Sequence, residues 1–405
     1  MTKRHRGGPL QGVRVVELTK VWAGPYTGKL LAFLGAEVIR VESEKSLDVT
    51  RVYGVSDINN APGFKAVNPE KLSVQIDMKS DEGIRLLLDL VQKSDVLIEN
   101  LRPGAVQRLG LDYKTIKAVK PDIVYTSMGM YGNEGPLSYQ TGYAPCFAAL
   151  GGISALVGYE GEPPAGMNVR YADSTFGAAA ALATVAALYH RNETGRGQYV
   201  DVSAVEAMSS MIGDALMSFT LNGEIATSTG NRHPEMAPHG VYPCLDNEWI
   251  CIAVRDDRAW NTLAQQLTAA PSTGAEVNLS RFTTLPQRKA NEDALDHCLA
   301  SWTQSQRADE LVEKLQQLGI AATKSLNSIE LISDVHLWAR EFYREVHGPD
   351  GQSQTIVGPG WKMSRGATIE NAAPNLGQHN DYIFGEVLGL TEAERRALDG
   401  SGVIR

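Results

Sequence analysis

Strand-like and helix-like segments alternate along the first third of the chain, and this alternation restricts the fold more than any other feature. Residues 12–18 (GVRVVEL) are rich in β-branched side chains. Residues 23–36 form an apolar helical pattern that starts near Pro25 and stops at Gly35, and residues 37–42 (EVIRVE) return to the strand pattern. Because such a crossover joins parallel strands with a right-handed turn, the segment predicts a βαβ unit.

The same alternation continues to residue 128. Helical patterns over 81–94 and 112–120 precede strand-like residues at 95–100 and 122–128. This order favours an α/β fold with a parallel sheet covered by helices on both faces. A Gly- and Pro-rich stretch, 129–152, then interrupts the pattern.

The remaining sequence predicts a second, smaller domain. Two long helices are expected around residues 175–191 and 203–221. Two strand-like runs then flank an Asp-Asn turn within 240–260, and residues 319–326 resemble another short strand.

We therefore expect three successive parts. Residues 1–227 form the first part of a large Rossmann-like domain, 228–325 a smaller α+β domain, and 326–405 a linker and a C-terminal return to the large domain.

Composition and charge exclude several classes of protein. The 405 residues carry a formal net charge of −9, whereas a general nucleic-acid binder needs a basic face. The four cysteines form no C-x-x-C pair or metal-ligand spacing, which argues against structural zinc and fits a reducing compartment. The basic N-terminus lacks a following apolar segment, and no uninterrupted apolar run appears long enough to cross a bilayer. We expect a cytoplasmic protein with no metal and no membrane or nucleic-acid partner.

The turn after the first strand leaves three interpretations open. Glu42 ends the second strand, where an acidic residue can hold the ribose of a nicotinamide cofactor. The turn itself reads TKVWAGPYTG, however, and lacks the glycines of G-x-G-x-x-G. It could be structural, bind a nicotinamide cofactor, or bind another nucleotide-bearing molecule.

Residues 95–113 (DVLIENLRPGAVQRLGLDY) give the most specific local signal. Glu99 and Asn100 stand at the carboxyl end of a predicted strand, where open α/β sheets bind ligands. Arg102 and Arg108 follow, and arginines suit phosphate groups because they pair with two oxygens at once. The alternative is a capped loop with solvated arginines.

Asp173 lies at the start of the long apolar helix. Aspartate is a common N-cap, and a helix N-terminus favours the ionised carboxylate. An ionised carboxylate can also attack an activated acyl group, and nearby amides can bind the developing oxyanion. The two interpretations are geometrically compatible.

The loop TGNRHPEMAPHGVYP, residues 229–243, contains Arg232, His233 and His239. No standard metal-ligand triad is completed there. We expect a structured loop that contacts substrate.

Several motifs together resemble one family, the class III coenzyme A transferases. This group includes formyl-CoA transferase, carnitine CoA-transferase and 2-methylacyl-CoA racemase. The motifs keep the family's order over nearly the whole chain, and they read PLQGVRVVEL, AGPYTGKLLAFLGAEVIRVE, DVLIENLRPGAVQRLGL, YADSTFGAAAALATVAALYHRNETGRGQYVDVS and NLGQHND.

The resemblance implies a fold, a substrate and a site. Members have a large Rossmann-like domain built from both chain ends, and two subunits thread through one another as an interlocked dimer, of identical or related chains. CoA thioesters are substrates, with no tightly bound cofactor and no metal. Asp173 matches the catalytic aspartate. The positions that match the CoA-binding residues are Trp22, Ala23, Arg40, Ile76, Lys79, Asn100, Leu101, Arg102 and Arg108.

The resemblance also separates the branches of the family. The racemase branch has a histidine where this chain has Tyr143, and tyrosine, with an ordinary pKa of about 10, shuttles protons poorly near neutral pH. The glycine run of the formyl-CoA transferases is absent, and residues 231–243 resemble transferases for larger acids, often with succinyl-CoA as donor. We therefore expect a CoA-transferase, with benzylsuccinate and other dicarboxylates as candidate acceptors. A 2-methylacyl-CoA racemase and a nicotinamide-dependent oxidoreductase are the alternatives.

Overall fold

The chain divides into two compact units. The computed structural model describes residues 5–166, 170–269 and 279–405. The larger unit takes Met1–Ser154, Gly166–Ile225 and Val335–Arg405, and the smaller unit takes Ala155–Ala165 and Ala226–Asp334. The smaller unit is therefore formed from two separate stretches of the chain, one of them only eleven residues long.

A six-stranded parallel sheet forms the centre of the larger unit. Its order is β3-β2-β1-β4-β5-β6, and every neighbouring pair is parallel. This is the strand order of the doubly wound dinucleotide-binding fold, so the predicted α/β class is confirmed. The strands are β1 (Arg14–Leu18), β2 (Glu37–Glu42), β3 (Leu72–Gln75), β4 (Val96–Glu99), β5 (Val124–Gly129) and β6 (Tyr199–Ser203).

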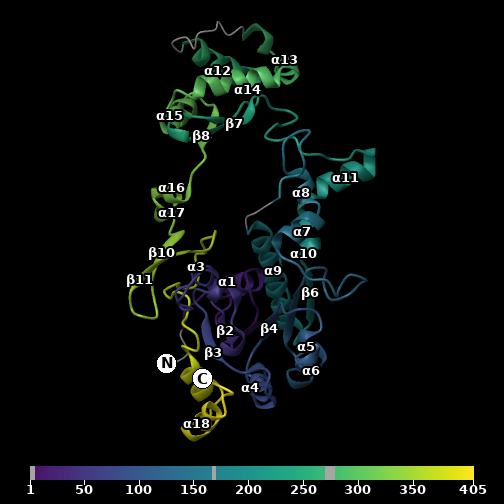
Figure 1. Cartoon of the computed structure of the whole chain (residues 1–405), viewed down its shortest axis with the longest axis vertical. Coiled ribbons are helices and arrows are strands. Elements are labelled where there is room, and N and C mark those ends of the chain that lie inside the picture. The colour runs from purple at the N-terminus through teal and green to yellow at the C-terminus, as the bar shows by residue number, and fades with distance from the viewer. Residues whose placement is uncertain (1–4, 167–169, 270–278) are drawn as a thin grey trace. The chain divides into compact units, whose positions relative to one another are not determined.

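Helices cover both faces of this sheet because its strands are apolar on both sides. Val15 packs with Leu31 of α1 (Ala23–Phe33) and Leu188 of α9 (Tyr171–Thr194) on one face. Val16 packs on the other face with α4 (Asp81–Gln92) and α6 (Tyr113–Val119). Figure 1 shows α1 and α9 lying together beside the sheet.

The other elements of the larger unit are short. The helices are α2 (Val49–Val52), α3 (Pro62–Val67), α5 (Ala105–Arg108), α7 (Ala144–Leu150), α10 (Ala204–Ser209), α11 (Gly213–Asn222), α17 (Val335–Ala339) and α18 (Glu392–Gly400), with short 3-10 helices at Glu44–Ser46 and Ser210–Ile212 and a π-helix at Tyr382–Val387. The helix α8 (Ile153–Leu156) begins in the larger unit and ends in the smaller one. A two-stranded antiparallel sheet joins β10 (Tyr343–His347) to β11 (Ser353–Val357).

The smaller unit is built on a three-stranded antiparallel sheet. Its strands β7 (His239–Pro243) and β8 (Trp249–Ala253) flank the predicted Asp-Asn turn, and β9 (Ala321–Lys324) pairs with β8. Trp260, Leu263 and Leu299 are fully or nearly fully buried against this sheet. The helices are α12 (Asp257–Ala269), α13 (Leu285–Ala290), α14 (Glu292–Thr303), α15 (Ala308–Gln317) and α16 (Ser328–Ile332).

α9 corrects one expectation about membranes. Its 24 residues make it long and apolar enough to cross a bilayer, by length and composition alone, although no such segment was predicted. In the fold 44% of its most apolar window is buried, where it packs against α1 and the sheet. The buried side chains of α9 therefore belong to the core of the larger unit.

Candidate active site

Asp173 is the third residue of α9, and it does not cap the helix. The helix begins two residues before it, Arg170 occupies the N-cap position, and no side chain caps the first turn. The N-cap interpretation of Asp173 is therefore wrong. Within the described residues, no hydrogen bond or ion pair occupies the Asp173 carboxylate, which leaves its oxygens available to a substrate.

The surroundings of Asp173 change its acidity. Burial raises the pKa of the carboxyl to about 6, and the positive charge of Arg170 partly opposes that rise. A half-buried carboxylate with a pKa near neutrality is a common feature of functional sites.

The turn between β1 and α1 lies directly against the start of α9. Trp22 Nε1 donates to Ser174 Oγ at 3.3 Å, and the Arg170 guanidinium lies 4.0 Å from the centre of a Trp22 ring. A Cβ added at Gly177 would come within 2.6 Å of the Ala23 carbonyl oxygen, so the two helices approach closely here. The structure thus brings Trp22, Ala23 and Asp173 together, as their positions in the motifs implied.

Two side chains from other segments hold this turn. The Lys20 amide donates to Asn100 Oδ1 at 2.7 Å, and Asn100 Nδ2 donates to the Lys20 carbonyl at 2.9 Å. Val21 adopts a positive φ of 71°, which is strained for a β-branched residue, and its amide donates to Asp48 Oδ2 at 3.0 Å. Asn100 therefore positions the turn through its side chain.

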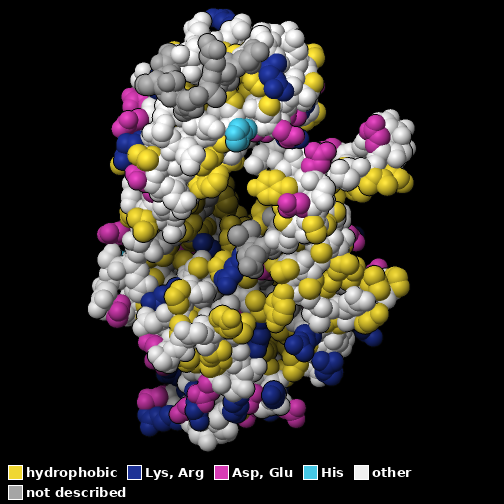
Figure 2. Space-filling model, turned by 45° about the horizontal axis from the view of Figure 1, so that its top comes forward, with side chains coloured by type: hydrophobic (Ala, Val, Ile, Leu, Met, Phe, Trp, Pro, Cys, Tyr) yellow, Lys and Arg dark blue, Asp and Glu magenta, His cyan; other side chains and the backbone are white. Residues whose placement is uncertain are grey.

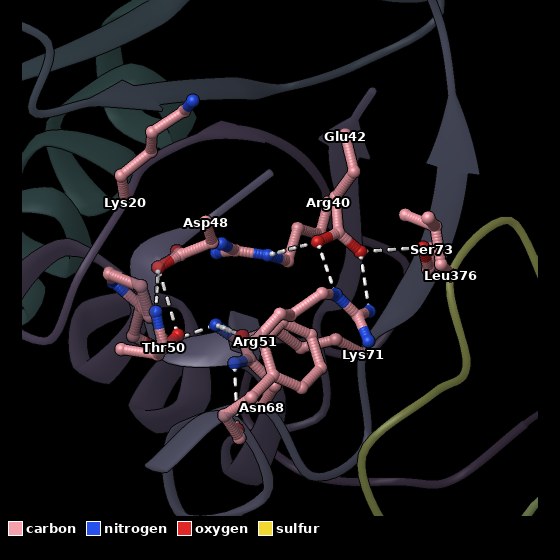
Figure 3. Close-up of polar contacts among 12 residues, drawn as sticks. Lys20, Arg40, Glu42, Asp48, Thr50, Arg51, Asn68, Lys71, Ser73 and Leu376 are labelled. Atoms are coloured by element: carbon pink, nitrogen blue, oxygen red, sulfur yellow. Dashed lines mark hydrogen bonds and ion pairs between the residues drawn. The ribbon is translucent and has the colours of Figure 1, made fainter. Parts of the chain in front are cut away.

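Arg40 is buried in a network of charges rather than exposed to solvent (Figure 3). Its guanidinium donates to Glu17 Oε1 at 2.6 Å and to Asp48. Burial by itself would lower the pKa of Arg40, but the carboxylates of Glu42, Glu17 and Asp48 raise it above its ordinary value. With 1% of the side chain exposed, Arg40 supports Asp48 and presents no surface to a phosphate.

The Glu42 carboxylate, like Arg40, is buried within this network, and both of its oxygens are hydrogen-bonded. It accepts from Arg51 Nε at 2.8 Å, from Arg51 Nη2 at 2.7 Å and from Ser73 Oγ at 2.7 Å (Figure 3). Hydrogen bonds to Arg51 and the charges of both arginines keep the pKa of Glu42 below its ordinary value despite its burial. Glu42 is thus not free to hold a ribose, which opposes the nicotinamide alternative.

The other predicted CoA-binding residues follow β3 and β4, at the edge of the sheet that also carries Trp22 after β1. Ile76 is fully buried, whereas Lys79 is exposed. The Leu101 amide donates to Glu99 Oε2 at 2.9 Å.

Arg102 and Arg108 lie just beyond Leu101 and are exposed. Gly104 has a φ of 77°, and a Cβ there would stand 3.0 Å from Arg108 Nη1, so the glycine leaves room for this guanidinium. Among the described residues, neither arginine has a carboxylate within ion-pair distance. Both are available to an anionic ligand.

The residues predicted to contact substrate are Tyr143, Arg232, His233 and His239, and they belong to different units of the chain. Tyr143 is 65% exposed at the N-terminus of α7. Arg232, in the smaller unit, pairs with Asp293 and lies 3.3 Å from Glu160 and 3.9 Å from both Glu292 and Asp296. This arrangement favours an arginine that anchors its own loop.

The two histidines of that loop also make local contacts. His233 Nδ1 accepts from the Glu235 amide at 3.0 Å, and His239 Nδ1 is hydrogen-bonded to the Asn231 carbonyl. Their ring centres are 5.3 Å apart. The part of the chain that the structure describes holds no group of three His, Cys, Asp or Glu side chains suited to a metal ion.

Comparison with known proteins decides the family. The model of CoA-transferase family III matches residues 10–380. The chain belongs to this family. The CoA-transferase is 33% identical, over all of both chains, to succinyl-CoA–D-citramalate CoA-transferase of Chloroflexus aurantiacus. It is 29% identical to succinate–glutarate CoA-transferase of Agrobacterium fabrum, over 95% of this chain and 96% of that one.

A solved structure agrees with this assignment. The CoA-transferase superposes on a CAIB/BAIF family protein from Brucella suis with a TM-score of 0.86, at 30% identity, over 94% of this chain and all of that chain.

Two residues of the transferase's candidate site were not predicted from the sequence. Asp48 holds the Val21 amide, and Arg170 lies over Trp22. Asp48 follows soon after the second strand, so its position near the carboxyl edge of the sheet could have identified it. The only sequence signal for Arg170 is that it precedes Asp173 by three positions, which is one helical turn.

Proposed function

We propose that this CoA-transferase moves coenzyme A from succinyl-CoA to a free carboxylic acid, with Asp173 as the nucleophile. The observation that carries the proposal is the half-buried Asp173 carboxylate beside the Trp22 turn, which has no hydrogen-bond or ion-pair partner in the part of the chain that the structure describes. The two named relatives act on succinyl-CoA with citramalate and on succinate with glutarate. A dicarboxylic acid is therefore the acceptor class that we propose.

The reaction proceeds by exchange of acyl groups on Asp173. An Asp173 oxygen attacks the donor's thioester carbon, the C–S bond breaks, and CoA thiolate leaves a mixed anhydride. The thiolate attacks the aspartyl carbon of the anhydride, which releases succinate and forms an aspartyl-CoA thioester. Every species is an activated acyl group of similar energy, so no ATP is consumed.

The second half repeats these steps with the acceptor. Its carboxylate attacks the aspartyl thioester, thiolate leaves again, and a second anhydride forms. Thiolate then attacks the acceptor's acyl carbon, which gives the new CoA thioester and frees Asp173. The site must exclude water during both halves, because the anhydrides hydrolyse.

Arg102, Arg108 and Lys79 are the groups that we propose for the phosphates of CoA. All three are exposed at the carboxyl edge of the sheet, and Arg102 and Arg108 have no acidic partner among the described residues. Paired donors of arginine fit phosphate oxygens. We assign Asn100 and Arg40 to holding the site rather than to direct contact with the nucleotide.

We also propose that the working molecule is an interlocked dimer, of two copies or of this chain and a related subunit. Large hydrophobic side chains gather along α11, at the right of Figure 2. Leu216, Met217, Phe219 and Leu221 on this helix are 52–73% exposed. Patches of this kind mark protein interfaces.

The test is a panel of carboxylic acids with succinyl-CoA or acetyl-CoA as donor, with products identified by mass spectrometry. Wild-type protein should form new CoA thioesters, and Asp173→Ala should form none while its affinity for CoA changes by less than about tenfold, or 1.4 kcal/mol. Turnover by Asp173→Ala would disprove the covalent route. Deuterium incorporation at the α-carbon of a chiral 2-methylacyl-CoA, without transfer, would instead support the racemase.

A further inference from the structure

We infer that Arg170 binds the second carboxylate of the dicarboxylic substrate and so sets the preference of this enzyme for dicarboxylic over monocarboxylic acyl groups. The inference rests on the proposed function, because it assigns a specificity residue to the reaction at Asp173. Arg232, from the loop expected to contact substrate, is a poorer candidate, since it is already shared among the acidic side chains of Glu160, Glu292, Asp293 and Asp296.

The position of Arg170 relative to Asp173 is fixed by the helix. Arg170 stands at the N-cap of α9 and Asp173 three residues later, so both lie on one face of its first turn. Residues three apart on a helix have Cβ atoms about 5–6 Å apart. A four-carbon dicarboxylic acyl group attacked by Asp173 can therefore extend its far end toward Arg170.

Arg170 is held away from Asp173 even though the two are close in sequence. Its guanidinium carbon lies 4.0 Å from the centre of a Trp22 ring, a cation–π contact, and Trp22 is itself held by Ser174 at 3.3 Å. Within the described residues the guanidinium makes no hydrogen bond or ion pair, and Asp173 is not bound to it. The cation is thus positioned without neutralising the nucleophile.

Arg170 is exposed, so an anion can reach its guanidinium from solvent. The helix α3 lies beside it, because a Cβ added at Gly63 would be in van der Waals contact with Arg170 Nη1, at 4.0 Å. A second carboxylate that enters the site without a partner would lose its hydration at a large cost. Arginine meets that requirement well, because it keeps its charge and pairs with both oxygens of a carboxylate.

The experiment compares two donors that differ only at the distal end, succinyl-CoA with its carboxylate and butyryl-CoA with a methyl group. With one fixed acceptor, wild-type kcat/KM should favour succinyl-CoA. Arg170→Gln should lower kcat/KM for succinyl-CoA by about 10- to 100-fold, the range for a lost charge-assisted hydrogen bond, and change the value for butyryl-CoA less than about threefold. Arg170→Lys should recover part of the preference, because it restores the charge without the paired donors.

Arg196→Gln is the matched control, since Arg196 is an exposed arginine just past the other end of α9, and it should leave both donors unaffected. Equal losses for both donors in Arg170→Gln would overturn the inference and show that Arg170 acts only by holding Trp22 or by keeping Asp173 ionised. Wild-type transfer that does not distinguish the donors would overturn the inference and leave the proposed function standing. No transfer from either donor would overturn both.

Discussion

At the scale of single residues, Asp173 balances two opposing effects. Burial favours its protonated form, whereas Arg170 favours the ionised form that attacks the thioester. Because the resulting pKa is about 6, the fraction of active carboxylate should rise as the pH passes through that value. We predict that kcat/KM, which reports the free enzyme, rises about tenfold per pH unit below this pKa and is level above it.

The measurement is the pH profile of kcat/KM for succinyl-CoA in the wild type and in Arg170→Gln. Removal of the positive charge removes the effect that lowers the pKa of Asp173, so the rising limb should move to higher pH in the variant. A wild-type profile that is flat down to about pH 4, near the ordinary pKa of aspartate, would contradict the burial of this carboxylate.

Residue types at the site were predictable from the sequence, but their partners were not. The motifs pointed to Asp173, Trp22 and Ala23, and these lie together. Arg40 was expected to bind CoA and Arg232 to contact substrate, yet both are paired with acidic side chains. Two of these partners, Glu17 and Asp293, lie 23 and 61 residues away in the chain, so local spacing could not have revealed those two pairs.

At the scale of elements, the close approach of α1 and α9 joins the two halves of the site. A Cβ at Gly177 would meet the Ala23 carbonyl oxygen at 2.6 Å and the Tyr26 ring at 3.1 Å. The first is a backbone atom, so Gly177→Ala must push α9 away from the turn that carries Trp22. We predict a lower Tm and a large loss of kcat, because misplacement of a nucleophile by about 1 Å can cost 100-fold.

Gly213→Ala is the control for this prediction. Gly213 begins α11, and a Cβ there would meet nothing within 4 Å. Alanine is the better helix former by about 1 kcal/mol, so this variant should keep its Tm and activity or gain slightly in Tm. If Gly177→Ala behaved like Gly213→Ala, the contact between the helices would not position Asp173.

The sequence pattern predicted long, apolar elements better than short ones. The first helix, the second strand and the long helix around 175–191 lie where periodicity placed them, as α1, β2 and α9. The helix expected over 203–221 is instead broken by a tight turn at Ser210–Ile212. β3, with only Ser73 and Val74 buried between two partly exposed residues, was not predicted, because four residues give too little alternation to distinguish a strand.

At the scale of the whole molecule, the exposed apolar residues of α11 are the observation that supports the proposed dimer. Phe219 and Leu221 are 57% and 73% exposed, which is costly in water unless another chain covers them. We predict that the chain alone forms a dimer of about twice its mass of 43.9 kDa, measured by light scattering. Phe219→Asp together with Leu221→Asp should reduce both the dimer fraction and the activity, whereas Thr220→Asp, an exposed position between them, should reduce neither.

Dilution distinguishes threaded subunits from subunits that only touch at a surface. A surface dimer dissociates as its concentration falls below its Kd, by mass action. Threaded subunits can separate only if part of the chain unfolds, so the dimer fraction should stay constant on dilution and fall only with denaturant, together with the loss of structure. A reversible monomer–dimer equilibrium would contradict threading, and a fully active monomer would contradict the dimer. If the chain were monomeric alone and became dimeric and active only with a related subunit, the partner would be that subunit rather than a second copy.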